Sequence, residues 1–393
     1  MRVEHPLSPE CRAVFWTAGP HSAHIADLAR SSLDWNRVVA LAQRETAVSS
    51  VWRAFAPAQD AVPVEAADHM RRGAMVSDFR MLQLEQRLKR TLQVLRGNNV
   101  EVMLLKGAAV GATVYPAFCD RPMVDVDMLV RPHDADAACH AMFEAGWRKT
   151  TDIELTELLQ GHHHLPPFVD PNQPGLKIEL HTSMMPGDHP FAVSDNDVWA
   201  AAGRAGDAYS GVAIPSPEHL LYHACVHFAW SHVMQFGAWR TFRDVNAIAR
   251  ASAIDWDAFV AFARRSRSAT ACYWTLRLAR RMGGVPVPDE ALRSLQAPLP
   301  AFVRRAAERH FIVQIAPGEG PVSPSVTLSR QLWRTAIRPH WSGHGAAQPW
   351  TKSRNWDYRR TGAVPAALPK RIATQLSAGR QWWRYLTGTL SRD

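Results

Sequence analysis

Two aspartates, Asp125 and Asp127, stand two residues apart in an otherwise apolar run from Val124 to Val130. Residues two apart in a strand lie on the same face of the sheet, so both carboxylates point the same way while their apolar neighbours pack inward. Two like charges held so close repel each other unless a cation lies between them, and a hard divalent ion such as Mg²⁺ suits carboxylate oxygens. The spacing therefore predicts a divalent-metal site.

A second feature precedes the aspartates, where an apolar run from Val100 to Leu105 ends in Lys106 and Gly107. A segment of small residues that reads as a helix start follows. Gly107 would let the backbone approach phosphate groups, and Lys106 would supply a point charge, which together predict a phosphate cradle. The alternative is that a Lys-Gly pair simply ends a strand at a turn.

Arg121 lies just before the paired aspartates. Its guanidinium group presents a planar fork of donors and can therefore clamp a triphosphate bidentately. Equally, Arg121 can be a structural partner for Asp125 or Asp120. Both interpretations place a cation beside the predicted metal site.

A two-metal site needs a third carboxylate, because two aspartates leave the second ion under-coordinated and the attacking hydroxyl without a base. The candidate is Glu179. Strand alternation puts Glu179 on the same face as Lys177 and His181, so it completes the site if its strand lies beside that of the aspartates. The alternative is an ordinary solvent-facing glutamate on a strand.

Several histidines invite a zinc assignment that their spacing does not support. The run 162–164 is consecutive, so its side chains do not converge on one ion, and no cysteine lies nearby. His223 and His227 stand four apart on one helix face, but the glutamate of a metalloprotease motif is missing. We expect the run at 162–164 to form a loop that touches substrate or lies exposed at the surface, and His223 and His227 to serve helix packing. Asp244 belongs to an amphipathic stretch and either faces solvent or reaches back toward the reacting groups.

Composition favours a folded protein of more than one unit. The chain has 393 residues, 47% hydrophobic content and 15 Trp, which can fill several cores. No apolar run approaches the roughly 20 residues of a membrane-spanning helix, and residues 1–6 lack the apolar core of a signal peptide. The five cysteines are unpaired in spacing and odd in number, which indicates free thiols and a cytoplasmic location.

Positive charge is concentrated at the C-terminal end of the chain. Residues 301–393 hold 15 Lys/Arg against 4 Asp/Glu, a balance of +11, whereas the whole chain carries +9. Six tryptophans lie among these basic residues: Trp333, Trp341, Trp350, Trp356, Trp382 and Trp383. The mixture can bind nucleic acid or an anionic surface, or it can be a solvated end that packs on the body through its tryptophans.

The elements that must position these residues divide the chain into five regions. We expect a loosely ordered N-terminus at 1–30, a helical region at 31–97, a mixed α/β core at 98–214, a helical domain at 215–290 and a basic, Trp-rich region at 291–393. A helix is predicted at 64–95 from leucines at three- and four-residue steps. Strands are predicted at 100–105, 123–130, 147–152, 165–169 and 176–182. Helices are predicted at 108–117, 134–145, 217–235, 239–251, 255–265 and 269–282.

These residues in combination resemble a known family. The motifs that carry the likeness are Leu104 to Gly107, Tyr115, Arg121, Asp125 to Val130, Ala145 to Trp147, His163, His164, Ile178 to His181, His227 and Asp244. Over about residues 33–290 the chain resembles the nucleotidyltransferases of DNA polymerase β type, and more narrowly a bacterial family of mostly uncharacterised members, some of which accompany peptide-modification gene clusters. The wider superfamily usually has Gly-Ser where this chain has Lys106 and Gly107.

The resemblance implies a mixed-sheet core flanked by helices, with two Mg²⁺ ions held by Asp125, Asp127 and Glu179. It implies transfer of a nucleoside monophosphate or phosphoryl group from an NTP such as ATP to the hydroxyl of an acceptor: a small molecule, a peptide or a protein. The alternative is a catalytically silent module that uses the basic tail to hold a polyanion. In a third interpretation the fold is structural and the carboxylates pair with Lys106 and Arg121.

Overall fold

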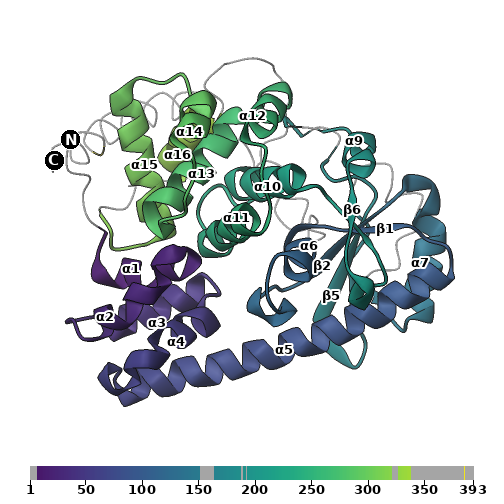
Figure 1. Ribbon diagram of the computed structural model, residues 1–393, viewed down its shortest axis with the longest axis horizontal. Helices are drawn as coiled ribbons and strands as arrows, with labels where there is room; N and C mark the ends of the chain where they lie inside the picture. The colour runs from purple at the N-terminus through teal and green to yellow at the C-terminus, as the bar shows by residue number, and fades with distance from the viewer. Residues whose placement is uncertain are drawn as a thin grey trace, which may run out of the picture.

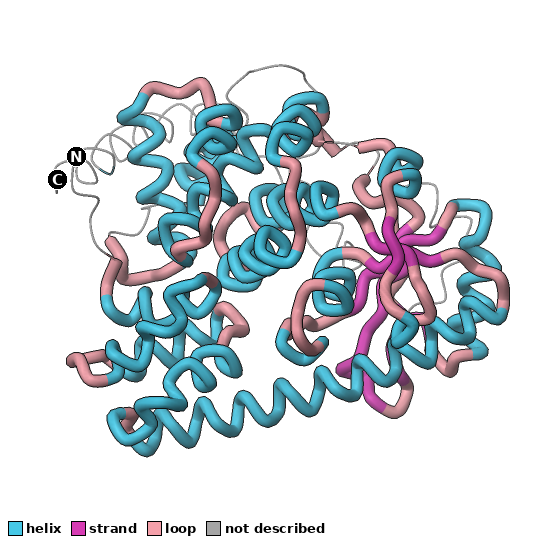
Figure 2. Tube along the Cα trace, in the orientation of Figure 1, coloured by secondary structure: helices cyan, strands magenta, loops and turns pink. Residues whose placement is uncertain are grey.

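The structure is a computed structural model that describes residues 7–150, 163–186, 189–191, 193–320, 326–337 and 385. Within these residues a seven-stranded sheet forms in the order β3-β4-β5-β2-β1-β7-β6. The strands are β1 (Val102–Leu104), β2 (Val126–Val130), β3 (Arg148–Lys149), β4 (Phe168–Asp170), β5 (Gln173–His181), β6 (Gly203–Arg204) and β7 (Ala213–Ile214). Strand β2 pairs with β5 in parallel and with β1 in antiparallel. The predicted mixed α/β fold is confirmed. Helices precede the sheet strands in the sequence and follow them, as the prediction had it (Figures 1 and 2).

Strands β2 and β5 lie at the centre of the sheet, and their burial pattern sets their register. Every residue of β2 is buried. On β5 Leu176, Ile178 and Leu180 are buried, whereas Lys177 and Glu179 between them are more exposed. A slip of one residue would turn Lys177 and Glu179 into the core, so burial of the apolar face opposes it. This fixed register places β5 side chains opposite particular β2 side chains.

The N-terminal region is helical and better ordered than the sequence predicted. Its helices are α1 (Pro9–Phe15), α2 (Ile25–Ala29), α3 (Trp35–Arg44) and α4 (Val48–Phe55). The loose order expected for 1–30 is not what the described residues show, because Cys11, Phe15 and Ile25 are fully buried. Helices α1 and α2 are short, so they carry too few turns for a clear hydrophobic period. Asp34 caps α3, accepting a hydrogen bond from the Arg37 amide at 3.2 Å.

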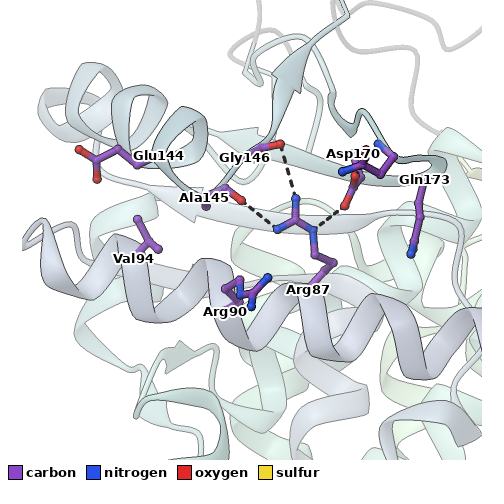
Figure 3. A pocket seen from close by; sticks show the side chains of 9 residues that line it. Arg87, Arg90, Val94, Glu144, Ala145, Gly146, Asp170 and Gln173 are labelled. Atoms are coloured by element: carbon purple, nitrogen blue, oxygen red, sulfur yellow. Dashed lines mark hydrogen bonds and ion pairs between the residues drawn. The ribbon is translucent and has the colours of Figure 1, made fainter.

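Helix α5 (Val64–Gly97) matches the long helix predicted at 64–95. It runs from the N-terminal helices to the sheet and so connects the two parts of the molecule (Figure 1). Arg87 fastens it to the sheet: its Nε donates to Asp170 Oδ2 at 2.5 Å and its Nη1 donates to the carbonyl of Ala145 at 2.8 Å (Figure 3). The guanidinium also stacks over the Trp147 ring at 4.8 Å.

After the sheet the chain is helical again. The helices are α10 (Pro217–Val226), α11 (Ala238–Ala251), α12 (Trp256–Arg265), α13 (Ala269–Gly283), α14 (Asp289–Leu295), α15 (Ala301–Ile315) and α16 (Val326–Ile337), while α6 (Lys106–Thr113), α7 (Ala135–Glu144) and α9 (Asp195–Ala200) lie within the α/β part. The single helix predicted at 217–235 is wrong in one respect. The α-helix ends at Val226 and a π-helical turn follows at His227–Ser231. A hydrophobic period does not distinguish these two kinds of turn.

Part of the basic C-terminal region packs on the helical body. Trp333, on α16, is buried, and its Nε1 donates to the carbonyl of Ala229 at 2.8 Å. The other five tryptophans of that region lie outside the described residues, as does any surface they form. No described helix is long and apolar enough to cross a membrane.

Candidate active site

The central feature of the site is a pair of acidic residues on neighbouring strands. Asp127 on β2 and Glu179 on β5 are direct partners across the parallel ladder, and His181 lies two residues further along β5. The ligand atoms of these three residues all lie within 4.8 Å of one another. The sheet therefore brings Glu179 beside the strand of the paired aspartates. This is the neighbouring arrangement that the sequence prediction for Glu179 required.

His181 is a member of this group that sequence reasoning placed on the correct face but assigned no role. Its Nε2 lies 2.8 Å from Asp127 Oδ1 and 3.8 Å from Glu179 Oε2, and the residue is 1% exposed. The signal was present, since Glu179 and His181 stand two apart on one strand. Imidazole nitrogen is a common metal ligand, but a lone histidine after a glutamate is not a specific pattern.

Asp125 lies at the edge of the acidic group rather than within the strand. Strand β2 begins at Val126, so the strand predicted at 123–130 starts later than expected. Asp125 is half-buried and is not among the three residues whose ligand atoms converge. Burial and the nearby Asp127 carboxylate raise the pKa of Asp125 above its ordinary value. The two aspartates therefore interact, but they are not equivalent.

Lys106 supplies the cation closest to the acidic group. Its Nζ donates to Asp127 Oδ1 at 2.6 Å, the same oxygen that His181 contacts. Burial would raise the pKa of Asp127, but Lys106 and His181 hold it well below its ordinary value. Among the described residues, none donates a hydrogen bond to Asp127 Oδ2, which leaves that oxygen available for a ligand. In this structure Lys106 thus binds a carboxylate, where the sequence predicted a phosphate.

Negative charge at the site exceeds the positive charge that Lys106 supplies. Burial and the charge of Asp127 raise the pKa of Glu179, as they raise that of Asp125. Such upward shifts mean that further protons or another cation would stabilise the group. Carboxylate oxygens with one imidazole nitrogen suit a divalent ion. The described residues therefore fit the metal that the sequence predicted.

Arg121 forms the second cationic contact of the region, with a partner that the sequence did not identify. Its Nη2 donates to Asp244 Oδ2 at 2.6 Å and its Nε to Asp244 Oδ1 at 3.0 Å, while the Tyr115 hydroxyl donates to the same Oδ1 at 2.9 Å. The alternative partners, Asp120 and Asp125, are not those observed, since Asp120 binds Arg53 at 3.1 Å. Asp244 is buried and reaches back from α11 toward the sheet, which was one of its two predicted orientations.

Gly107 is required by the position of Arg121. A Cβ at residue 107 would lie 2.7 Å from Arg121 Nη1, closer than side chains approach each other. The guanidinium cannot easily yield, because Asp244 holds it on two sides. The glycine therefore allows the close approach of an arginine, where the sequence predicted the approach of phosphates.

The comparison with family models decides which family this geometry represents. A model described as uncharacterised nucleotidyltransferase matches residues 31–284, more than half of the chain. The chain belongs to this nucleotidyltransferase family. The match includes β1 to β7, the acidic group and Asp244. No curated protein and no solved structure matches the chain.

Imidazole rings surround the acidic group of this nucleotidyltransferase family member. The ring centroids of His163 and His164 lie 5.3 Å and 5.4 Å from that of His181. Burial lowers the pKa of His163 to about 2 and that of His181 to about 4, so both are neutral at pH 7. His162, the first of the predicted run, lies outside the described residues. The described pair is therefore part of the surroundings of the site and not a surface run.

The helical part of the chain adds a second set of rings. His227 lies 6.2 Å from His223 and 4.5 Å from His232, measured between ring centroids. His227 begins the π-helical turn, and Val233 and Met234 after it have φ values of 44° and 55°. Left-handed conformation is unfavourable for a β-branched residue, and π turns are frequent at functional sites. His223 is buried in α10, which agrees with the packing role expected for it.

A cavity of ≈ 640 Å³ lies elsewhere on the molecule and shares no residue with the acidic group. It is lined by residues of α5, α7 and the loops at one end of β4 and β5, among them Arg87, Glu144 and Asp170 (Figure 3). Arg87 is already bound by Asp170 and by backbone carbonyls. The cavity therefore lies between elements that Arg87 holds together, and the residues that line it form no set of groups that could perform transfer.

Proposed function

We propose that the protein transfers a nucleoside monophosphate from an NTP to the hydroxyl of an acceptor, as an enzyme of the DNA polymerase β type. The observation that carries the proposal is the direct pairing of Asp127 with Glu179 on parallel strands, two residues after Asp125. Family membership supports the reaction class. Burial and the charge of Asp127 raise the pKa values of Asp125 and Glu179, which supports the binding of a cation beside these carboxylates.

Asp125, Asp127 and Glu179 would hold two Mg²⁺ ions, with His181 beside them. When bound, such ions acidify an attacking hydroxyl and stabilise a pyrophosphate leaving group. Lys106 and His181 both contact Asp127 Oδ1, so they fix the carboxylate and leave its Oδ2 without a donor among the described residues. The described residues thus preorganise the donor set, and positioning of this kind supplies much of the rate in phosphoryl chemistry.

The reaction proceeds as an in-line displacement. The acceptor oxygen forms a bond to the α-phosphorus, the bond from that phosphorus to the bridging β-oxygen breaks, and pyrophosphate leaves with the electron pair. The hydroxyl proton passes to a base. Glu179 is placed to accept it, because it lies directly opposite Asp127 in the acidic group.

Residues 98–214 form the catalytic core in this proposal, and residues 215–290 form a helical domain that contributes to acceptor or nucleotide binding. Contact between the two is made by Arg121 and Asp244, one from each. The buried pair would keep α11 at a fixed distance from the acidic group. Acceptor choice then depends on residues of the helical domain near the same helix.

The test is mass spectrometry of candidate acceptors, and of the protein itself, after incubation with Mg²⁺ and each of the four NTPs. A mass gain of one nucleoside monophosphate supports the proposal, whereas a gain of phosphate alone assigns phosphoryl transfer instead. The matched control is Asp125→Asn combined with Asp127→Asn. Equal product from the wild type and this double variant would refute the mechanism.

A further inference from the structure

Three cations lie on the elements that meet at the acidic group: Lys106, Arg121 and Arg240, the last one helical turn before Asp244 on α11. Two of them are already engaged. Lys106 binds Asp127 at 2.6 Å, and Arg121 binds Asp244 through two nitrogens. A nucleotide that enters this site brings several negative charges on its polyphosphate. Neither engaged cation can bind these charges without leaving a buried carboxylate unpaired, which is costly.

Arg240 is the cation that remains. Among the described residues its guanidinium group forms no hydrogen bond and no ion pair, although the side chain is half-buried. Partial burial removes water from the guanidinium group, which costs free energy, and no charge-assisted hydrogen bond to another described residue offsets that cost. Burial and the repulsion of Arg121 accordingly lower the pKa of Arg240. These facts indicate a side chain whose partner is an anionic ligand.

The backbone before α11 leaves room for the guanidinium group of Arg240. Arg240 stands in the first turn of α11, three residues after the N-cap Gly237, which has a φ of 72°. A Cβ on Gly237 would lie 2.8 Å from His232 Nδ1 and 3.3 Å from Arg240 Nη2. Only a residue without a side chain leaves room for both groups there, and the positive φ also favours glycine. The strained segment at Val233 and Met234 leads into this arrangement.

We propose that Arg240 binds the β- and γ-phosphates of the nucleotide. This inference rests on the proposed function and extends it by naming the residue that receives the leaving group. The helical part of the chain supplies Arg240, whereas the α/β part supplies the carboxylates. The planar guanidinium fork matches two phosphate oxygens, and Arg240 lies one helical turn before Asp244, the α11 residue that binds Arg121 of the α/β part. Pyrophosphate then leaves bound to Arg240 after the bond to the α-phosphorus breaks.

Inorganic tripolyphosphate is the probe for this assignment, because it carries the charges of the nucleotide without its base. Isothermal titration calorimetry on the full chain compares wild type, Arg240→Ala and Arg240→Lys, with and without Mg²⁺. We expect Arg240→Ala to weaken binding roughly 10- to 100-fold and Arg240→Lys to restore part of it, since charge-assisted hydrogen bonds are lost and the fork geometry is absent in lysine. The Michaelis constant for the NTP should rise more than kcat falls.

Arg250→Ala is the matched control. Arg250 is an exposed arginine on the same helix, ten residues further along and so about 15 Å away. Its removal should leave tripolyphosphate binding within twofold of wild type. Binding by Arg240→Ala within twofold of wild type would overturn the inference, and so would the absence of any binding to the wild type in either buffer.

The two proposals can fail separately. Tripolyphosphate binding that depends on Arg240, without nucleotidyl transfer to any acceptor, supports the phosphate site and counts against the proposed reaction. Nucleotidyl transfer with an unchanged Michaelis constant in Arg240→Ala counts against the phosphate site alone. Circular dichroism of each variant confirms that the fold is intact, so a loss of binding reports the removed side chain.

Discussion

Asp127 and Glu179 face each other across two parallel strands that are far apart in the sequence. The pairing joins carboxylates from β2 and β5 into one group, with His181 completing it. Burial of Leu176, Ile178 and Leu180 on the other face of β5 holds that register. The acidic group therefore exists only because β2 and β5 pair in this register. Substitutions of its members and of the cations beside it test its role.

Removal of the aspartate charges should abolish transfer. For Asp125→Asn with Asp127→Asn we expect a fall in kcat/KM of about a thousandfold, because several kcal/mol of metal-assisted stabilisation are lost. Nucleotide turnover by mass spectrometry measures the loss. Asp257→Asn, an exposed aspartate on α12, is the control and should retain full activity.

Lys106 should matter most when no metal is bound. Lys106→Met leaves the buried Asp127 carboxylate without its cation, so we expect a loss of about 3 kcal/mol in the free energy of unfolding in EDTA. Added Mg²⁺ or Mn²⁺ should restore part of it, because an ion that binds only the folded state stabilises that state. Thermal unfolding with and without metal measures both effects. Equal stability of variant and wild type in EDTA would show that the ion pair contributes nothing.

Gly107→Ala should act through Arg121. The added Cβ would lie 2.7 Å from Arg121 Nη1, so the guanidinium must move and its contacts with Asp244 weaken. We expect a loss of about 2 kcal/mol in the free energy of unfolding, in the range for disturbed buried ion pairs and overpacking. In an Arg121→Ala background the same substitution should cost much less. A double-mutant cycle by urea denaturation measures the coupling, and additive effects would contradict it.

Glu45 should give stability an unusual dependence on pH. Burial raises the pKa of this fully buried carboxyl to about 7, against an ordinary 4.5, while it accepts a hydrogen bond from the Trp239 amide at 3.0 Å. Between these two values the folded state holds a proton that the unfolded state has lost. Stability from this group is therefore complete below pH 4.5 and is lost as the pH rises through about 7, by about 3 kcal/mol.

The measurement is thermal unfolding between pH 4.5 and pH 8. Glu45→Gln keeps the shape of the side chain without its titration, so its stability should fall less over that interval than the wild type's does. Glu65→Gln, at an exposed position in the first turn of α5, is the matched control and should follow the wild type. Parallel curves for wild type and Glu45→Gln would assign the pH dependence to other groups.

Much of the local structure could be predicted from the sequence. The helices at 239–251, 255–265 and 269–282 agree with α11, α12 and α13 to within a residue at each end. These helices could be predicted because the hydrophobic period and the capping residues both depend on interactions between residues close together in the sequence. Asp255 illustrates this: it caps α12 by accepting from the Ala258 amide at 2.9 Å. The π-helical turn at His227 escaped prediction because the same hydrophobic period fits both turn types.

The composition of the candidate site was also readable, but its connections were not. Alternation along β5 placed Glu179 and His181 on one face, yet only the parallel pairing with β2 brought Glu179 opposite Asp127. Arg121 had two nearby aspartates as possible partners in the sequence and binds a third, Asp244, from 123 positions away. Contacts of that separation depend on how whole elements dock, which local patterns do not encode.

By itself the sequence determined the chemical inventory: two aspartates on one face of a strand, a glutamate and a histidine on one face of another, and cations before the aspartates. Tertiary structure decided which cation meets which carboxylate. Lys106 is bound to Asp127 and Arg121 to Asp244, whereas Arg240, one turn before Asp244, has no partner among the described residues. The physical reason is that alternation is fixed by the geometry of one strand, whereas charge pairing is fixed by the burial that docks the helices against the sheet.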